Sequence, residues 1–182
     1  KSTLIQYPIG NTATSYKIPH SVTTIGSIAF RECSNLTSID LSGTQVETIG
    51  SNAFESCTSL TSIHFPDSVT SIGSYAFYQC TSLTSINIPD SVTTIGSGAF
   101  RYCSSLTSIT IPDSVTTIGS SAFGWSWGPI GSPSTVYVKD VDPTDAHTMT
   151  TLQNTISGKI YSSNGTVTYT QWVEPNYAPN TP

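Results

Sequence analysis

Apolar residues recur at one spacing along most of the chain. In the segment SSLTSITIP (residues 104–112) the apolar positions are Leu106, Ile109 and Ile111, and the last two alternate with polar residues. A period of two predicts a short half-buried strand, with Leu and Ile inside and the Ser and Thr side chains outside. Pro112 has no amide hydrogen to give to a sheet, so we expect the strand to end there.

The residues after this strand predict the rest of one structural unit. Pro-Asp-Ser favours a turn, because Asp and Ser side chains can bond nearby backbone amides. Val115 and Ile118 then predict a second short extended piece with both side chains inside. Gly119 suits a backbone angle that β-branched residues resist. Ala122 and Phe123 are expected to open a helical or 3₁₀ turn that carries a core aromatic ring.

The unit repeats along the chain. Successive Ala-Phe pairs are offset by 24, 23, 23 and 23 residues. Self-similarity at such a period predicts a solenoid of stacked coils, because one unit cannot bury its apolar face alone. We therefore expect equivalent residues to form columns, and the clearest column comprises Phe30, Phe54, Phe77, Phe100 and Phe123.

The pattern L-T-S-I-x-I-P-D-S-V-T-T-I-G-x-x-A-F-x-x-C-x-S resembles the BspA-like leucine-rich repeat family, also called the Treponema type. The resemblance covers about residues 18–111 and continues more weakly to Val138. It implies a leucine-rich-repeat solenoid with a parallel β-sheet on one face of the coils and short extended or 3₁₀ turns on the other. Members are large secreted or surface-anchored bacterial proteins implicated in adhesion, and the repeat has no catalytic residues.

Four regions are predicted. Residues 1–17 are expected to form an N-terminal capping strand region, and residues 18–140 an array of about five repeats. Residues 141–173 predict an α+β cap, with a helix over 146–156 and a β-hairpin about Asn164-Gly165. Residues 174–182 are interpreted as a linker.

Two repeats depart from the consensus. In the second, Leu41 to Val46 replaces the Pro-Asp-Ser-Val turn and adds one residue. In the fifth, Gly124 to Pro129 replaces the segment that carries the cysteine. Both departures predict a locally different surface.

One cysteine occurs in each of four repeats, at Cys33, Cys57, Cys80 and Cys103. The equal register predicts a buried column of free thiols. Disulfides between neighbours are allowed by the expected Cα distance, but stacked side chains point in parallel rather than toward one another. No CxxC pair supports a zinc site.

Composition excludes several classes of partner. Only 9% of the 182 residues are charged, against roughly 25% in an ordinary soluble domain. The net charge of −5 and the scattered Lys and Arg residues argue against nucleic acid. No apolar run is long enough to insert this segment into a membrane. The chain begins at Lys1 without the features of a signal peptide, so any secretion signal is expected outside the segment.

Positions that vary between repeats are the candidate ligand contacts. They include the outward strand row and the aromatic residues that flank the Ala-Phe pairs, because Tyr and Trp often anchor protein interfaces. Relaxed constraint on a solvated surface is the alternative interpretation. The candidates are Asp40, His64, Asn87, Thr110 and Tyr137 in the row, with Tyr75, Tyr78, Tyr102, Trp125 and Trp127 beside the pairs.

No constellation predicts catalysis or a cofactor. His64 and Asp40 are the nearest approach to a catalytic pair, and such a pair arises by chance among many serines. Phosphate loops and zinc-protease motifs do not occur. One carboxylate per turn, as in Asp67 and Asp90, provides too few oxygens for calcium. His20 occupies the same turn position and is interpreted as a turn variant.

The sequence therefore predicts a non-enzymatic, extracellular, monomeric module that adheres to a protein or glycan of a host or neighbouring cell. A structural spacer without a ligand is the first alternative. The second is an array that binds ice or a crystalline polysaccharide through regular hydroxyl and methyl groups. Its columns would be Thr37, Thr61, Thr84 and Thr107, and Thr24, Ser71, Thr94 and Thr117.

Overall fold

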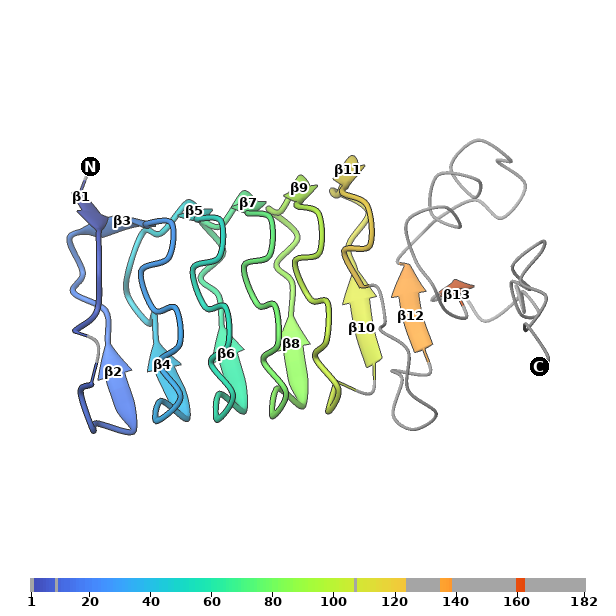
Figure 1. Cartoon of the computed structure of the whole chain (residues 1–182). Coiled ribbons are helices and arrows are strands. Elements are labelled where there is room, and N and C mark those ends of the chain that lie inside the picture. Colours follow the sequence, from blue (N-terminus) through green and yellow to red (C-terminus); the bar gives the residue numbers. More distant parts are fainter. Residues whose placement is uncertain (1, 9, 107, 124–134, 139–159, 163–182) are drawn as a thin grey trace, which may run out of the picture.

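The chain forms coils that stack side by side along one axis, as the repeat predicts (Figure 1). The computed structural model describes residues 2–8, 10–106, 108–123, 135–138 and 160–162. Within these ranges the regular elements are all short β-strands joined by turns. The predicted helix over 146–156 lies outside the described residues.

Two parallel sheets run along the stack, because each coil contributes one strand to each. The first, sheet A, contains six strands: β1 (Ser2–Leu4), β3 (Val22–Ile25), β5 (Thr48–Ile49), β7 (Ser71–Ile72), β9 (Thr94–Ile95) and β11 (Thr117–Ile118). The second, sheet B, contains seven: β2 (Ser15–Lys17), β4 (Ser38–Asp40), β6 (Ser62–His64), β8 (Ser85–Asn87), β10 (Ser108–Ile111), β12 (Thr135–Val138) and β13 (Ile160–Ser162). The extended pieces expected opposite the main sheet thus form a sheet of their own.

The coils stack in register, so equivalent residues form columns. Ile39 pairs with Ile63, and Ile63 pairs with Ile86. In β10, Ile109 and Ile111 are buried while Thr110 is exposed, and the strand ends before Pro112. The predicted alternation and strand end are confirmed.

The prolines after the sheet B strands open tight turns. The amide of Val69 donates to the carbonyl of Pro66 at 3.1 Å, and Val92 and Pro89 repeat the bond at 3.0 Å. The serine of each turn donates to the preceding coil, as in Ser91 Oγ to Val69 O at 2.6 Å. The turn prediction is confirmed, but the serine bonds a carbonyl of the adjacent coil rather than a local amide.

The residues around each Ala-Phe pair form a third hydrogen-bonded side, the turn ladder (residues 26–33, 50–57, 73–80 and 96–103). The amides of Ala53, Glu55 and Cys57 close local turns within their coil. The amides between them donate to the following coil, as in Phe54 N to Ala76 O at 2.7 Å. The expected turn is present, since these local bonds span three residues as in a 3₁₀ turn, but it does not continue as a helix because every second amide is used between coils.

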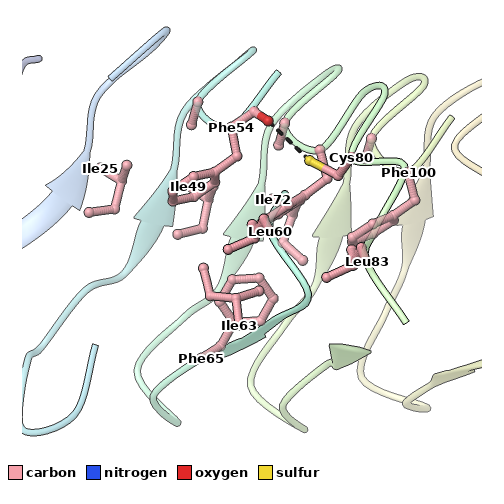
Figure 2. Close-up of a cluster of buried hydrophobic side chains, with 14 of the residues drawn as sticks. Ile25, Ile49, Phe54, Leu60, Ile63, Phe65, Ile72, Cys80, Leu83 and Phe100 are labelled. Atoms are coloured by element: carbon pink, nitrogen blue, oxygen red, sulfur yellow. Dashed lines mark hydrogen bonds between the residues drawn. The ribbon is translucent and has the colours of Figure 1, made fainter. Parts of the chain in front are cut away.

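The core contains a column of phenylalanine rings, of which Figure 2 labels Phe54 and Phe100 among buried Ile and Leu side chains. Phe54 and Phe77 stack with centroids 5.0 Å apart and planes 18° from parallel. The column continues through Phe100 to Phe123, with a centroid separation of 5.6 Å for that pair. At the other end Tyr7 stacks on Phe30 at 5.3 Å and takes the position of a further ring. The predicted column is confirmed and begins one coil earlier than the Ala-Phe pairs indicate.

The repeated glycine is required by close contact between coils. A Cβ atom on Gly73 would lie 2.7 Å from the carbonyl carbon of Gly50, and one on Gly119 would lie 2.2 Å from the amide nitrogen of Ser97. Neither glycine has a positive φ. The expected reason for Gly119, an unusual backbone angle, is therefore wrong, because any side chain would collide with the neighbouring backbone.

The C-terminal predictions are met only in part by described residues. Strand β13 pairs in parallel with β12 and adds one more strand to sheet B. The other hairpin strand, over 166–173, and the linker over 174–182 lie outside the described residues. The α+β cap stays a prediction.

We expect Gly73→Ala to destabilise the protein by about 1–3 kcal/mol, because the new methyl group must push two coils apart. Ser51→Ala is the control, since Ser51 is an exposed residue of the turn ladder. Urea unfolding monitored by circular dichroism would measure both. Equal midpoints for the two variants would contradict the close-contact explanation.

Candidate functional site

The outward row of sheet B is one continuous column of exposed side chains. Lys17 pairs with Asp40, His64 pairs with Asn87, and Asn87 pairs with Thr110. Thr110 in turn pairs with Tyr137, of which the structure describes only the backbone. The predicted row is thus assembled by the register, and the five described members of this column from Lys17 to Thr110 are exposed.

Lys17 belongs to the row, although sequence reasoning missed it. The triplet Ser-Tyr-Lys of β2 has the same alternation as Ser-Ile-Asp of β4, but an aromatic residue takes the place of Ile. Lys17 Nζ lies 3.4 Å from Asp40 Oδ2, and the amide of Ser42 donates to Asp40 Oδ1 at 2.8 Å. The bonds from Ser42 and the nearby Lys17 lower the pKa of the Asp40 carboxyl group, so this part of the row carries a fixed negative charge beside a positive one.

A hollow of about 480 Å³ opens beside this row, where the second repeat has its extra residue. Its walls include Asp40, His64 and Pro66. The loop from Leu41 to Val46 bends at Gly43, which has a φ of 72°. Gly43 O lies 3.0 Å from His20 Nδ1, which agrees with the interpretation of His20 as a turn variant. The departure from the consensus therefore produces the predicted local change of surface.

Three tyrosines gather on the turn ladder and form what we call the tyrosine patch (Tyr75, Tyr78 and Tyr102). The rings of Tyr75 and Tyr78 meet edge to face with centroids 5.7 Å apart. Tyr78 and Tyr102 do the same at 5.0 Å. Burial and the adjacent Tyr102 raise the pKa of the Tyr78 hydroxyl group. The predicted gathering of these rings is confirmed, while Trp125 and Trp127 lie outside the described residues.

Arg101 extends the tyrosine patch with a positive charge. The centre of its guanidinium group lies 4.9 Å from the centroid of the Tyr102 ring, and its Nη2 lies 3.3 Å from the Tyr102 hydroxyl oxygen. Its Nε atom is buried and has no hydrogen-bond partner. Sequence reasoning placed Arg101 in a variable column but did not select it, because only the aromatic residues were used as the signal.

The two predicted groups do not come together. The exposed row belongs to the strands of sheet B, whereas the tyrosine patch belongs to the turn ladder that leads away from sheet A. They are therefore two separate candidate surfaces, and a ligand that contacts one need not contact the other.

The most variable positions of the turn ladder have a left-handed backbone. The residue before Ala-Phe has φ near 57°, as in Asn52 and Tyr75 (56°), and so does the second residue after Phe, as in Gln79 (58°) and Tyr102 (65°). Left-handed backbone favours glycine and costs other residues free energy. Ile, Asn, Tyr and Ser all occupy the position before Ala-Phe, although only Asn among them favours a left-handed backbone. The preference for a backbone angle therefore does not explain which side chain is present.

Ile28 gives a stability test of this geometry, because it is a β-branched residue with φ of 58° and half of its surface exposed. We expect Ile28→Gly to stabilise the protein by up to about 1 kcal/mol by removing the steric cost. The neighbouring substitution Ser27→Gly should destabilise it, since Ser27 has no positive φ. Urea unfolding of both variants measures the difference. Destabilisation of equal size in both would contradict the prediction.

The four cysteines are free, and Cys57, Cys80 and Cys103 are buried. The thiol of Cys80 donates to the carbonyl of Phe54 at 3.1 Å, as the dashed line in Figure 2 marks. Cys57 and Cys103 bond Phe30 and Phe77 in the same way. Burial raises the pKa of the Cys57 and Cys103 thiols to about 12. The predicted buried thiol column is confirmed for Cys57, Cys80 and Cys103, whereas Cys33 in the first coil is only half-buried. The three buried members are neutral structural groups rather than nucleophiles.

These thiols predict a loss of stability at alkaline pH. Between pH 9 and about 12 the unfolded chain loses thiol protons that the folded chain keeps. The free energy of unfolding should therefore fall as pH rises, by at most about 1.4 kcal/mol per pH unit for each thiol. Cys103→Ala should show a shallower fall than the unmodified chain in urea unfolding at pH 8 to 10.5, under reducing conditions. Parallel curves would contradict the assignment.

One threonine column uses its hydroxyl groups within the protein. Thr61 Oγ1 donates to Thr37 O at 3.1 Å, and Thr84 Oγ1 donates to Thr61 O at 3.2 Å. The second column, which includes Thr94 and Thr117, lies on sheet A in register. Each of these hydroxyl groups donates its one hydrogen to a backbone carbonyl and cannot donate it to water at the same time. The ice-binding alternative therefore loses part of its basis.

Among the residues that the structure describes, no group of three or more His, Cys, Asp or Glu side chains could hold a metal ion. The same part of the chain contains no helix that is long and apolar enough to cross a membrane.

A family comparison agrees with the repeat geometry. The model of the BspA type leucine-rich repeat region matches residues 10–127 in six copies. The chain belongs to this family. No curated protein sequence matches it.

Solved structures of bacterial leucine-rich repeat proteins have the same fold. A leucine-rich repeat protein of T. pallidum is 29% identical with a TM-score of 0.63, over 74% of this chain and 62% of that one. One from Bacteroides ovatus is 30% identical with a TM-score of 0.57, over 69% of this chain and 42% of that one. The pneumococcal vaccine antigen PcpA shares the fold at 24% identity and a TM-score of 0.61, over 86% of this chain and 42% of that one. This chain thus spans less than two thirds of each.

Proposed function

We propose that this chain is a non-enzymatic, extracellular binding module of a bacterial surface protein, and that it adheres to a protein of a host or neighbouring cell. The family supports the setting, because a leucine-rich repeat scaffold of this type is typical of bacterial surface proteins. The module acts as one copy, with the stacked coils holding a rigid binding surface.

The observation that carries the proposal is the tyrosine patch. Three aromatic rings from two neighbouring coils meet on the surface. In the second coil the equivalent positions hold the polar residues Asn52, Glu55 and Ser56. The buried core is formed by the phenylalanine column and its aliphatic neighbours and does not include these three tyrosines. The tyrosine rings are therefore not needed to fill the core. Tyrosine and arginine are, with tryptophan, the residue types enriched among the residues that dominate binding at protein interfaces.

Two sets of substitutions test which surface binds. The first set, Tyr75→Asn, Tyr78→Ser and Tyr102→Ser, removes the rings and uses small polar residues of the kind that other coils carry. The second set, His64→Ser, Asn87→Ser and Thr110→Ser, changes the exposed row and leaves the rings in place. Both sets should keep the circular dichroism spectrum and unfolding midpoint, because all six positions lie outside the phenylalanine core.

We expect the first set to weaken binding at least about tenfold, and the second set to leave it within a factor of about two. The chain is screened against extracellular matrix proteins and a glycan array, and each hit is measured by surface plasmon resonance. Loss of binding in the second set alone would move the site to the exposed row. Absence of any ligand would favour the structural spacer.

A further inference from the structure

Arg101 differs from the other cations that the structure describes. Lys17 pairs with Asp40, and Arg31 pairs with both Glu32 and Glu55 at 3.3 Å. Arg101 takes part in none of the ion pairs among the described residues, although it occupies the same column of the repeat as Arg31. The same column therefore holds Arg31, which contacts two carboxylates, and Arg101, which has no acidic partner among the described residues.

The guanidinium group of Arg101 is held in place but not saturated with hydrogen bonds. The Tyr102 ring lies against it at 4.9 Å, and the Tyr102 hydroxyl oxygen accepts from Nη2 at 3.3 Å. Its Nε has no partner, and an arginine has five N–H donors in all. Nε is buried and closed to a ligand, whereas one bond, from Nη2 to Tyr102, leaves further N–H donors of the two Nη atoms for an acceptor from outside the chain.

The surroundings favour a negatively charged acceptor. The negative charge of Glu55 acts on Tyr78, and its carboxylate shares Arg31 with Glu32 and accepts from Asn52 Nδ2 at 2.7 Å. Arg31, Glu32 and Glu55 together carry a charge of −1, and Arg101 is the described cation that lies directly against a tyrosine of the patch, so a ligand carboxylate has its counter-charge there. The net charge of −5 acts over the whole chain and is screened beyond about 8 Å at physiological salt.

The ring geometry favours a peptide over a sugar. The planes of Tyr75 and Tyr78 are 77° apart, and those of Tyr78 and Tyr102 are 83° apart. Rings that stand nearly perpendicular in succession provide no coplanar platform for a pyranose. They instead leave ring edges and hydroxyl groups between which side chains of a peptide can pack.

We propose that Arg101 and the tyrosine patch bind an acidic peptide segment of the partner protein, with an Asp or Glu carboxylate on the Arg101 guanidinium group. This inference rests on the proposed function and names its partner chemistry. The planar guanidinium group binds a carboxylate through two parallel hydrogen bonds, which a lysine cannot reproduce. The tyrosines exclude water from this contact and pack against the flanking residues of the peptide.

The test uses pairs of short synthetic peptides. One member of each pair has Asp or Glu among aromatic and aliphatic residues, and its twin has Asn or Gln at the same positions. Fluorescence anisotropy measures the binding of each pair to the whole chain. We expect the acidic member to bind about ten to a hundred times more tightly than its twin. The absence of such a preference overturns the proposal.

Variants of Arg101 and Arg31 test whether the preference for the acidic peptide depends on Arg101. Arg101→Gln should abolish the difference between the twins, and Arg101→Lys should restore only part of it. Arg31→Gln is the matched control from the same column and should leave the preference unchanged. A preference that survives Arg101→Gln, or a preference for acidic sugars over acidic peptides, overturns the proposal. The unfolding midpoint of each variant is measured alongside.

Failure of this inference can be separated from failure of the proposed function. If the tyrosine set abolishes binding to a partner protein while Arg101→Gln does not, the adhesive surface stands and only the carboxylate contact is wrong. If neither change affects binding to any partner, both are wrong.

Discussion

Backbone hydrogen bonding between successive coils is the interaction on which the rest of this structure depends. Each coil is bonded to its neighbour at sheet A, at sheet B and along the turn ladder. Side chains add to the same connections, as in Thr61 to Thr37 O and Ser91 to Val69 O. These bonds fix the register, and the register places each phenylalanine over the next and each variable residue in a column. The repeated glycine permits this close approach, because a Cβ atom at that position would overlap the adjacent backbone.

The sequence alone was sufficient for the parts of the fold that repeat without change. The strand of sheet B, the proline turn, the phenylalanine column and the thiol column all follow from the period and from alternation of apolar and polar residues. The turn ladder could not be predicted in the same way, because its alternating bonds depend on backbone angles that the residues do not favour. Ile28 and Tyr75 have left-handed φ values that neither residue type would indicate.

The candidate site likewise has parts that the sequence predicted and parts that it did not. Register predicted the exposed row, and the neighbouring positions of Tyr75, Tyr78 and Tyr102 predicted that the rings would meet. Lys17 was missed because Tyr16 replaces the isoleucine that marks the strand elsewhere. That Arg101 has no acidic partner among the described residues could not be recognised from sequence, because it depends on where Glu32 and Glu55 direct their carboxylates. Those carboxylates contact Arg31, one end of the same column.

The extra residue of the second repeat has a consequence for how such arrays change in length. A whole unit of 23 residues can be gained or lost while every interface between coils stays the same. A single added residue must be taken up within one loop, and here the loop from Leu41 to Val46 takes it up with Ser42, Gly43 and Gln45 exposed while Val46 stays fully buried. Duplication would thus shift the distance between surface features along the axis in steps of about 4.8 Å. Small insertions would instead alter one loop and leave that distance unchanged.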